Sequence, residues 1–78
     1  MSRNAELVAV VRDLASQVEP AEVAQTLEDF ANRLEALGLE GDALTLEVVS
    51  LACALHHLGQ SEAGDRLGDA LWGERAAA

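Results

Sequence analysis

The segment from residue 42 to residue 58, DALTLEVVSLACALHHL, would be apolar around most of its circumference if it were helical. One stripe recurs at intervals of four and three residues and consists of Leu44, Val48, Leu51, Leu55 and Leu58. A second stripe, on nearly the opposite side, consists of Leu46, Val49 and Cys53. A helix that is hydrophobic on most sides is normally buried. We therefore expect this segment to be the central helix of a small bundle, or of a bundle completed by a second copy of the chain.

The two segments before it have the periodicity of amphipathic helices. The first, over residues 4–18, carries its apolar stripe at Leu7, Val11, Leu14 and Val18. The second, over residues 20–37, carries its stripe at Val23, Leu27, Phe30, Leu34 and Leu37. Pro20 separates the two helices, because proline disfavours a helical residue before it and suits the first position of a new helix. Gly38 is expected to end the second helix in the left-handed conformation.

A shorter helix is expected over residues 61–72, followed by a frayed tail over residues 74–78. Gly64 and Gly68 weaken this helix, each by about 1 kcal/mol relative to alanine. Their four-residue spacing suggests a side where another backbone comes close. No segment alternates as a strand would. The sequence thus predicts an all-α fold, with residues 1–78 as a single helical domain. We expect a small antiparallel bundle of three long helices and one short C-terminal helix.

The size and composition of the chain favour self-association. The chain has 78 residues, of which 50% are hydrophobic and only 3% are aromatic. A monomer of this size buries roughly 60% of the surface that its unfolded chain exposes, which leaves it marginally stable. Two apolar faces on the central helix also exceed what three short neighbouring helices can cover. We therefore predict a homodimer joined through the 42–58 helix.

The charge and the single cysteine limit the partners and the compartment. A formal net charge of −9 should repel nucleic acids and anionic membranes, and it favours a basic protein as partner. Cys53 has no second cysteine to pair with, so nothing indicates an oxidising compartment. The N-terminal residues do not have the pattern of a signal peptide, and no apolar run approaches the roughly 20 residues of a membrane span. We expect a cytoplasmic protein, and the lysine-free, alanine-rich composition suggests a bacterial or phage genome.

The residues that can carry chemistry do not form a known catalytic pattern. The sequence contains no glycine-rich phosphate loop, no HExxH motif and no nucleophile elbow. We therefore expect no enzyme, no catalytic residue, no cofactor and no metal site. Cys53 and His57 could share a helical face with His56 nearby, but a structural zinc site requires four ligands. Cys53 is interpreted as a small buried hydrophobic residue. His56 and His57 are expected to interact with the helix dipole or to hydrogen-bond across a helix interface, and the alternative is that they act as a pH switch.

The last helix carries the most suggestive surface for binding a partner. The residues of this surface follow 3-4-3 spacing and lie on the side of the helix opposite its apolar residues. They are Glu62, Asp65, Asp69 and Trp72. Tryptophan is enriched at the energetic centres of protein interfaces. This surface, rimmed by acidic residues, is therefore the candidate site for contact with another protein.

The leading hypothesis is a small non-catalytic regulatory module that binds another protein and acts as a helical homodimer. The alternative is an anionic mimic of nucleic acid, such as a phage anti-restriction or anti-CRISPR protein, which would bind a basic nucleic-acid-binding partner. A mimic needs acidic residues grouped on one surface. Here they are spread over several helices, with Arg12, Arg33 and Arg66 among them. A third, more distant hypothesis is a metal or redox sensor at Cys53 and His57.

Overall fold

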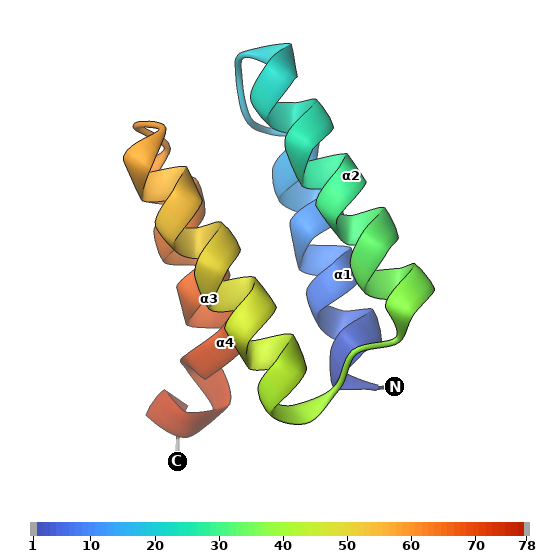
Figure 1. The fold of residues 1–78 in the computed structure, drawn as a ribbon. Helices are drawn as coiled ribbons and strands as arrows, with labels where there is room; N and C mark the ends of the chain where they lie inside the picture. Colours follow the sequence, from blue (N-terminus) through green and yellow to red (C-terminus); the bar gives the residue numbers. More distant parts are fainter. Residues whose placement is uncertain (1, 78) are drawn as a thin grey trace. The chain divides into compact units, whose positions relative to one another are not determined.

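The computed structural model describes the backbone of residues 2–77 and the side chains of residues 2–72. Within that part of the chain there are four α-helices and no strand (Figure 1). The helices are α1 (Arg3–Ala15), α2 (Ala21–Leu37), α3 (Gly41–His57) and α4 (Ser61–Ala77). The all-α class that the sequence predicts is confirmed.

The helices pack in two pairs, α1 with α2 and α3 with α4. The chain divides accordingly into two compact units, which we call the first pair (Met1–Glu40) and the second pair (Gly41–Ala78). The sequence-based expectation of one domain over residues 1–78 stays a prediction, as does the homodimer.

Helix α1 begins one residue before the predicted start and ends three residues before the predicted end. Ser2 precedes its first turn, and the Ser2 hydroxyl accepts a hydrogen bond of 3.1 Å from the backbone N–H of Ala5. At the other end, the backbone N–H of Ser16 donates to the carbonyls of Arg12 and Asp13. The Ser16 hydroxyl also donates to the Asp13 carbonyl, at 2.6 Å. A serine that bonds the preceding turn in this way competes with helix continuation, and α1 therefore ends at Ala15.

The predicted ends hold for α2 but not for the C-terminal end of α4. Pro20 precedes α2, and Gly38 follows it with φ of 59° while its N–H donates to the Leu34 carbonyl. Both features match the sequence prediction. Helix α4 instead continues to Ala77, past the predicted end at residue 72 and through residues 74–77 of the predicted frayed tail. Glutamate, arginine and alanine, which fill positions 74–77, are good helix formers. Residue 78 lies outside the described residues.

Aliphatic side chains form the core, as the near absence of aromatic residues predicts. The buried hydrophobic residues of the first pair are Leu7, Val8, Val11, Leu14, Ala15, Val23, Leu27, Ala31 and Leu34. Those of the second pair are Leu44, Val48, Leu51, Leu55, Ala63, Leu67 and Leu71. The only buried polar side chain among the described residues is that of Asn4. Its amide donates to the carbonyls of Leu34 and Leu39, at 3.0 and 2.8 Å, and so ties the start of α1 to the end of α2.

The two apolar stripes of α3 have different environments. Four members of the first stripe are buried, namely Leu44, Val48, Leu51 and Leu55. The fifth member, Leu58, follows the end of the helix and is exposed. The second stripe stays at the surface of the chain, with Leu46 70% exposed and Val49 partly exposed. Cys53 is also exposed, which corrects the interpretation of this residue as buried. The correction has a simple cause: Cys53 belongs to the second stripe, and only the first stripe is buried.

No helix in the described part of the chain has both the length and the apolar character needed to cross a membrane.

Candidate functional site

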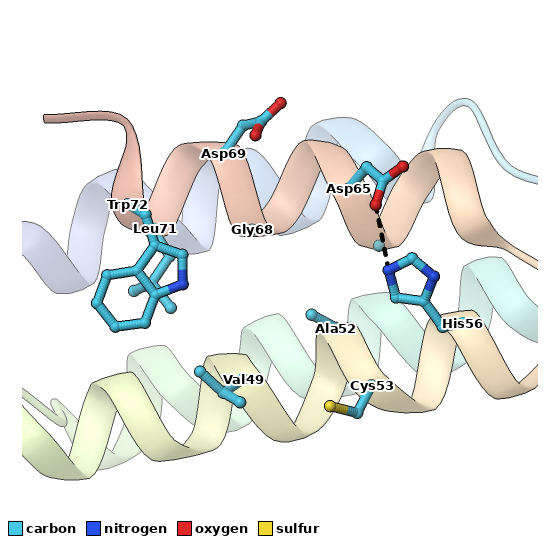
Figure 2. A pocket seen from close by; sticks show the side chains of 10 residues that line it. Val49, Ala52, Cys53, His56, Asp65, Gly68, Asp69, Leu71 and Trp72 are labelled. Carbon is cyan, nitrogen blue, oxygen red and sulfur yellow. Dashed lines mark ion pairs between the residues drawn. The ribbon is translucent and has the colours of Figure 1, made fainter. Parts of the chain in front are cut away.

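The second pair contains an open groove between its two helices, with a volume of about 360 Å³ (Figure 2). We call it the α3–α4 groove. Helix α3 lines it with Val49, Ala52, Cys53 and His56. Helix α4 lines it with Gly64, Asp65, Gly68, Asp69, Leu71 and Trp72. The two sides differ in character, because the acidic residues all belong to α4.

The groove has a polar end and an aromatic end. At the polar end, Nε2 of His56 lies 3.3 Å from Oδ1 of Asp65, so that the two helices are joined by an ion pair when the histidine is protonated. At the other end, the indole of Trp72 extends from α4 towards Val49 on α3 (Figure 2). Ala52 lies along the stretch between these ends (Figure 2). The middle of the groove is therefore lined by small side chains.

The two glycines of α4 have different surroundings. A Cβ atom added at Gly64 would lie 2.8 Å from two atoms of the His56 ring and 3.1 Å from the carbonyl oxygen of Ala52. Helices α3 and α4 therefore approach closely at Gly64, where a larger residue would have to displace the His56 ring and would press against the Ala52 carbonyl. A Cβ added at Gly68 would have no other atom within 4 Å. The space beside Gly68 is empty groove, and the packing of the pair does not account for glycine at that position.

The rim of the groove is negatively charged at neutral pH. Asp65 and Asp69 are four residues apart on α4, so they lie one turn apart, and both are exposed. On the α3 side, the lining residues other than His56 have no ionisable group except the thiol of Cys53. A ligand in the groove would thus meet apolar and small side chains in the middle and carboxylates along one edge.

The groove brings together most of the predicted partner surface and part of the predicted dimer contact. Trp72, Asp65 and Asp69, predicted to bind a partner, line it together with Val49 and Cys53, predicted to form the dimer contact. The fourth residue of the predicted partner surface, Glu62, is exposed on α4 and is not among the lining residues. Leu46 is exposed on α3 and likewise does not line the groove.

Sequence reasoning offered a contact across a helix interface as one role for the histidines, but it did not identify Asp65 as the partner of His56. It also missed Ala52 as a lining residue. The four-residue spacing of Gly64 and Gly68 was the available signal for a close approach of helices, and it holds at Gly64. His57 is exposed and does not line the groove. In the part of the chain that the structure describes, no three His, Cys, Asp or Glu side chains are grouped as metal ligands would be.

A second hollow lies along α2 alone and has a different character. It is lined by Thr26, Asp29, Phe30 and Arg33. The guanidinium of Arg33 lies over the Phe30 ring, 5.4 Å from its centroid, so the aromatic face is already covered by a cation of the same helix. This hollow is therefore the weaker candidate.

No protein-family model, no curated protein and no solved structure matches the chain. What the α3–α4 groove can do must therefore follow from its own chemistry. Protein interfaces combine an apolar centre, often with tryptophan, and a polar rim. The groove has this composition, with Trp72 and Leu71 at one end and the carboxylates of Asp65 and Asp69 at the edge.

Proposed function

We propose that the chain is a small, non-catalytic regulatory module that binds another protein through the second pair and acts as a homodimer. The observation that carries the proposal is the exposure of large apolar side chains on that pair. Leu46 is 70% exposed on α3, and Trp72 is 42% exposed on α4. Single exposed apolar residues are ordinary, whereas grouped ones mark an interaction surface. Trp72 lines the α3–α4 groove, and Leu46 lies on one helical stripe with Val49 and Cys53, which also line it.

We further infer that the helices within each pair run antiparallel, which gives α3 and α4 one continuous outer surface. Short connections between helices favour this arrangement. In the first pair it is supported by the bonds from Asn4, near the start of α1, to the carbonyls of Leu34 and Leu39 at the end of α2. In the second pair it is supported by the contact of His56, at the end of α3, with Asp65 near the start of α4.

The second stripe of α3 is the surface that we assign to the homodimer. Leu46, Val49 and Cys53 follow heptad spacing, which suits packing of one helix against another. None of the three is charged, so two copies of this stripe can meet without bringing like charges directly together. Covering Leu46 alone removes from water a side chain whose full burial is worth about 1.5–3 kcal/mol.

We propose a cytoplasmic location, in keeping with a chain that carries one exposed thiol, that of Cys53. A reducing compartment keeps such a thiol from forming disulfides between copies.

The dimer is tested by light scattering during size-exclusion chromatography at micromolar concentration. The wild-type chain should have the mass of two copies, and Leu46→Gln, which removes the largest exposed apolar side chain of the stripe, should have the mass of one. Leu37→Gln is the matched control, because Leu37 is 61% exposed but belongs to the first pair. A wild-type chain with the mass of one copy would contradict the homodimer.

A further inference from the structure

We propose that the α3–α4 groove binds an amphipathic helix of another protein that carries lysine or arginine beside its apolar face. In this arrangement an apolar side chain of the partner occupies the space beside Gly68 and Ala52. A basic side chain of the partner pairs with Asp65 or Asp69. The inference rests on the proposed function and adds to it the chemistry of the partner.

The first observation is the empty space beside Gly68. A glycine in the interior of a helix costs about 1 kcal/mol relative to alanine, so it normally has a packing or conformational reason. Gly64 has such a reason in the ring of His56, at 2.8 Å from an added Cβ, whereas Gly68 has no atom within 4 Å. Departures from local preference that internal packing does not explain are expected at functional positions. The space beside Gly68 is where a side chain from outside can enter.

The second observation is the charge at the groove. Asp65 and Asp69 project from the same helix along one edge, and the whole chain has a net charge of −9. A second copy of the chain would bring further acidic residues to this edge, and like charges at close range oppose association. Basic residues on the partner would instead gain from the attraction. Charge complementarity therefore selects a basic partner over a second copy for this groove.

The shape of the groove favours a helix as the partner element. A groove between two packed helices accepts a third helix, whose apolar face is read at positions three and four residues apart. Asp65 and Asp69 are about 6 Å apart along the axis of α4, at 1.5 Å per residue. Two basic residues four positions apart on the partner have the same spacing. Trp72 at the end of the groove adds a large apolar side chain to the lining.

The homodimer and the partner helix share part of their surface. Val49 and Cys53 belong both to the second stripe of α3 and to the lining of the groove, whereas Leu46 belongs to the stripe alone. The two contacts should therefore compete. The Leu46→Gln chain isolates the groove, because this substitution acts on the dimer contact and leaves every lining residue unchanged.

The test is calorimetric titration of the Leu46→Gln chain with two synthetic amphipathic helical peptides. Both have the same leucine positions, and one carries lysine where the other carries glutamate. The lysine peptide should bind with a stoichiometry of one, and the glutamate peptide should not bind. Adding Asp65→Asn and Asp69→Asn should weaken binding about tenfold, because the contributions of two exposed charge pairs add to about that factor. The matched control is Glu22→Gln with Asp42→Asn, which makes the same change in net charge at exposed positions outside the groove and should weaken binding much less.

A second variant tests the space rather than the charge. Gly68→Leu should reduce binding more than about tenfold by filling the groove, while its thermal midpoint stays at or above that of the parent chain. The inference is overturned if the lysine peptide does not bind, or if the groove variants behave as the charge control does. It is also overturned if Gly68→Leu in the wild-type background dissociates the homodimer, since a second copy would then occupy the groove. The proposed function itself is contradicted only if, in addition, the wild-type chain is a monomer and neither peptide binds. A dimeric wild-type chain that does not bind the lysine peptide contradicts the inference alone.

Discussion

The two helix pairs are joined in different ways. In the first pair, directed polar bonds link α1 to α2: the Asn4 amide donates to two carbonyls, and the Arg12 guanidinium donates to both carboxylate oxygens of Glu35, at 3.0 and 3.2 Å. In the second pair, the helices approach closely at Gly64, His56 meets Asp65, and a groove with exposed apolar residues remains open beside them.

This difference indicates that the first pair contributes mainly to stability and the second pair mainly to recognition. The hydrogen bonds of the buried Asn4 amide are satisfied and fix one packing arrangement of α1 against α2. An open groove has the reverse character, because its exposed apolar surface and unexplained glycine contribute little to folding. We therefore interpret the first pair as the structural part of the chain and the second as the part that contacts a partner. Three predictions test this contrast, in order of decreasing effect.

The largest effect is expected at Asn4. Asn4→Ala removes the donor of two hydrogen bonds within a buried site and should lower the free energy of unfolding by about 1–3 kcal/mol. Asn32→Ala is the matched control, because the Asn32 side chain is exposed and accepts one bond, from Arg12. It should change the unfolding free energy by less than about 0.5 kcal/mol. Urea denaturation followed by circular dichroism measures both, and equal effects would remove the structural role assigned to Asn4.

The two glycines of α4 should respond to alanine with opposite signs. Gly68→Ala gains helix propensity without meeting another atom and should raise the free energy of unfolding by about 1 kcal/mol. Gly64→Ala gains the same propensity but meets the His56 ring and the Ala52 carbonyl. The exposed His56 ring can rotate away, but the Ala52 carbonyl belongs to the α3 backbone, so an added Cβ requires the two helices to shift apart. We expect the cost of this shift to exceed the gain in helix propensity, so that Gly64→Ala is less stable than the wild type. The thermal unfolding midpoints of the two variants test whether the effects have opposite signs. Equal stabilisation by both would show that the second pair does not need the close approach at Gly64.

The smallest effect is expected at the exposed contact of Glu35 with Arg12, and it should depend on pH. The hydrogen bond from Arg12, helped by its charge, lowers the pKa of the Glu35 carboxyl. A carboxyl with a lowered folded-state pKa adds stability above its unfolded pKa and loses it as the pH falls through the folded pKa. Glu35→Gln should therefore be slightly less stable than the wild type at neutral pH, and the difference should vanish in acid. Urea midpoints at several pH values measure this, and a difference independent of pH would mean that charge is not the cause.

Much of the fold follows from the sequence because its signals are local. The four-three spacing of leucine and valine predicts that α3 is a helix and identifies the stripe that is buried, although it does not distinguish that stripe from the exposed one. Pro20 and Gly38 mark the ends of α2. The ends of α1 and α4 were less predictable. Ser16 ends α1 through a bond to Asp13 that spacing does not reveal, and the residues after Trp72 continue α4 because nothing but one glycine interrupts them.

The candidate site could be predicted in its parts but not as a whole. Helical spacing identifies Trp72, Asp65 and Asp69 on one helix and Val49 and Cys53 on another. Their meeting along one groove depends on how α4 lies on α3, which is a tertiary fact. The same limit explains the error at Cys53, since a second apolar stripe on a helix can be a core face or an open surface. The nucleic-acid mimic stays a hypothesis.

The central claim is that the second stripe of α3 is an open surface that associates with another protein surface. The rate at which a thiol reagent labels Cys53 tests it directly, because this is the single cysteine of the chain and it lies on that stripe. Labelling should be fast in dilute wild-type chain and slow as the chain concentration rises into the range of the dimer. It should stay fast at all concentrations in Leu46→Gln. Labelling that is slow at every concentration and limited by global unfolding would contradict the account, because Cys53 would then be buried within the single chain.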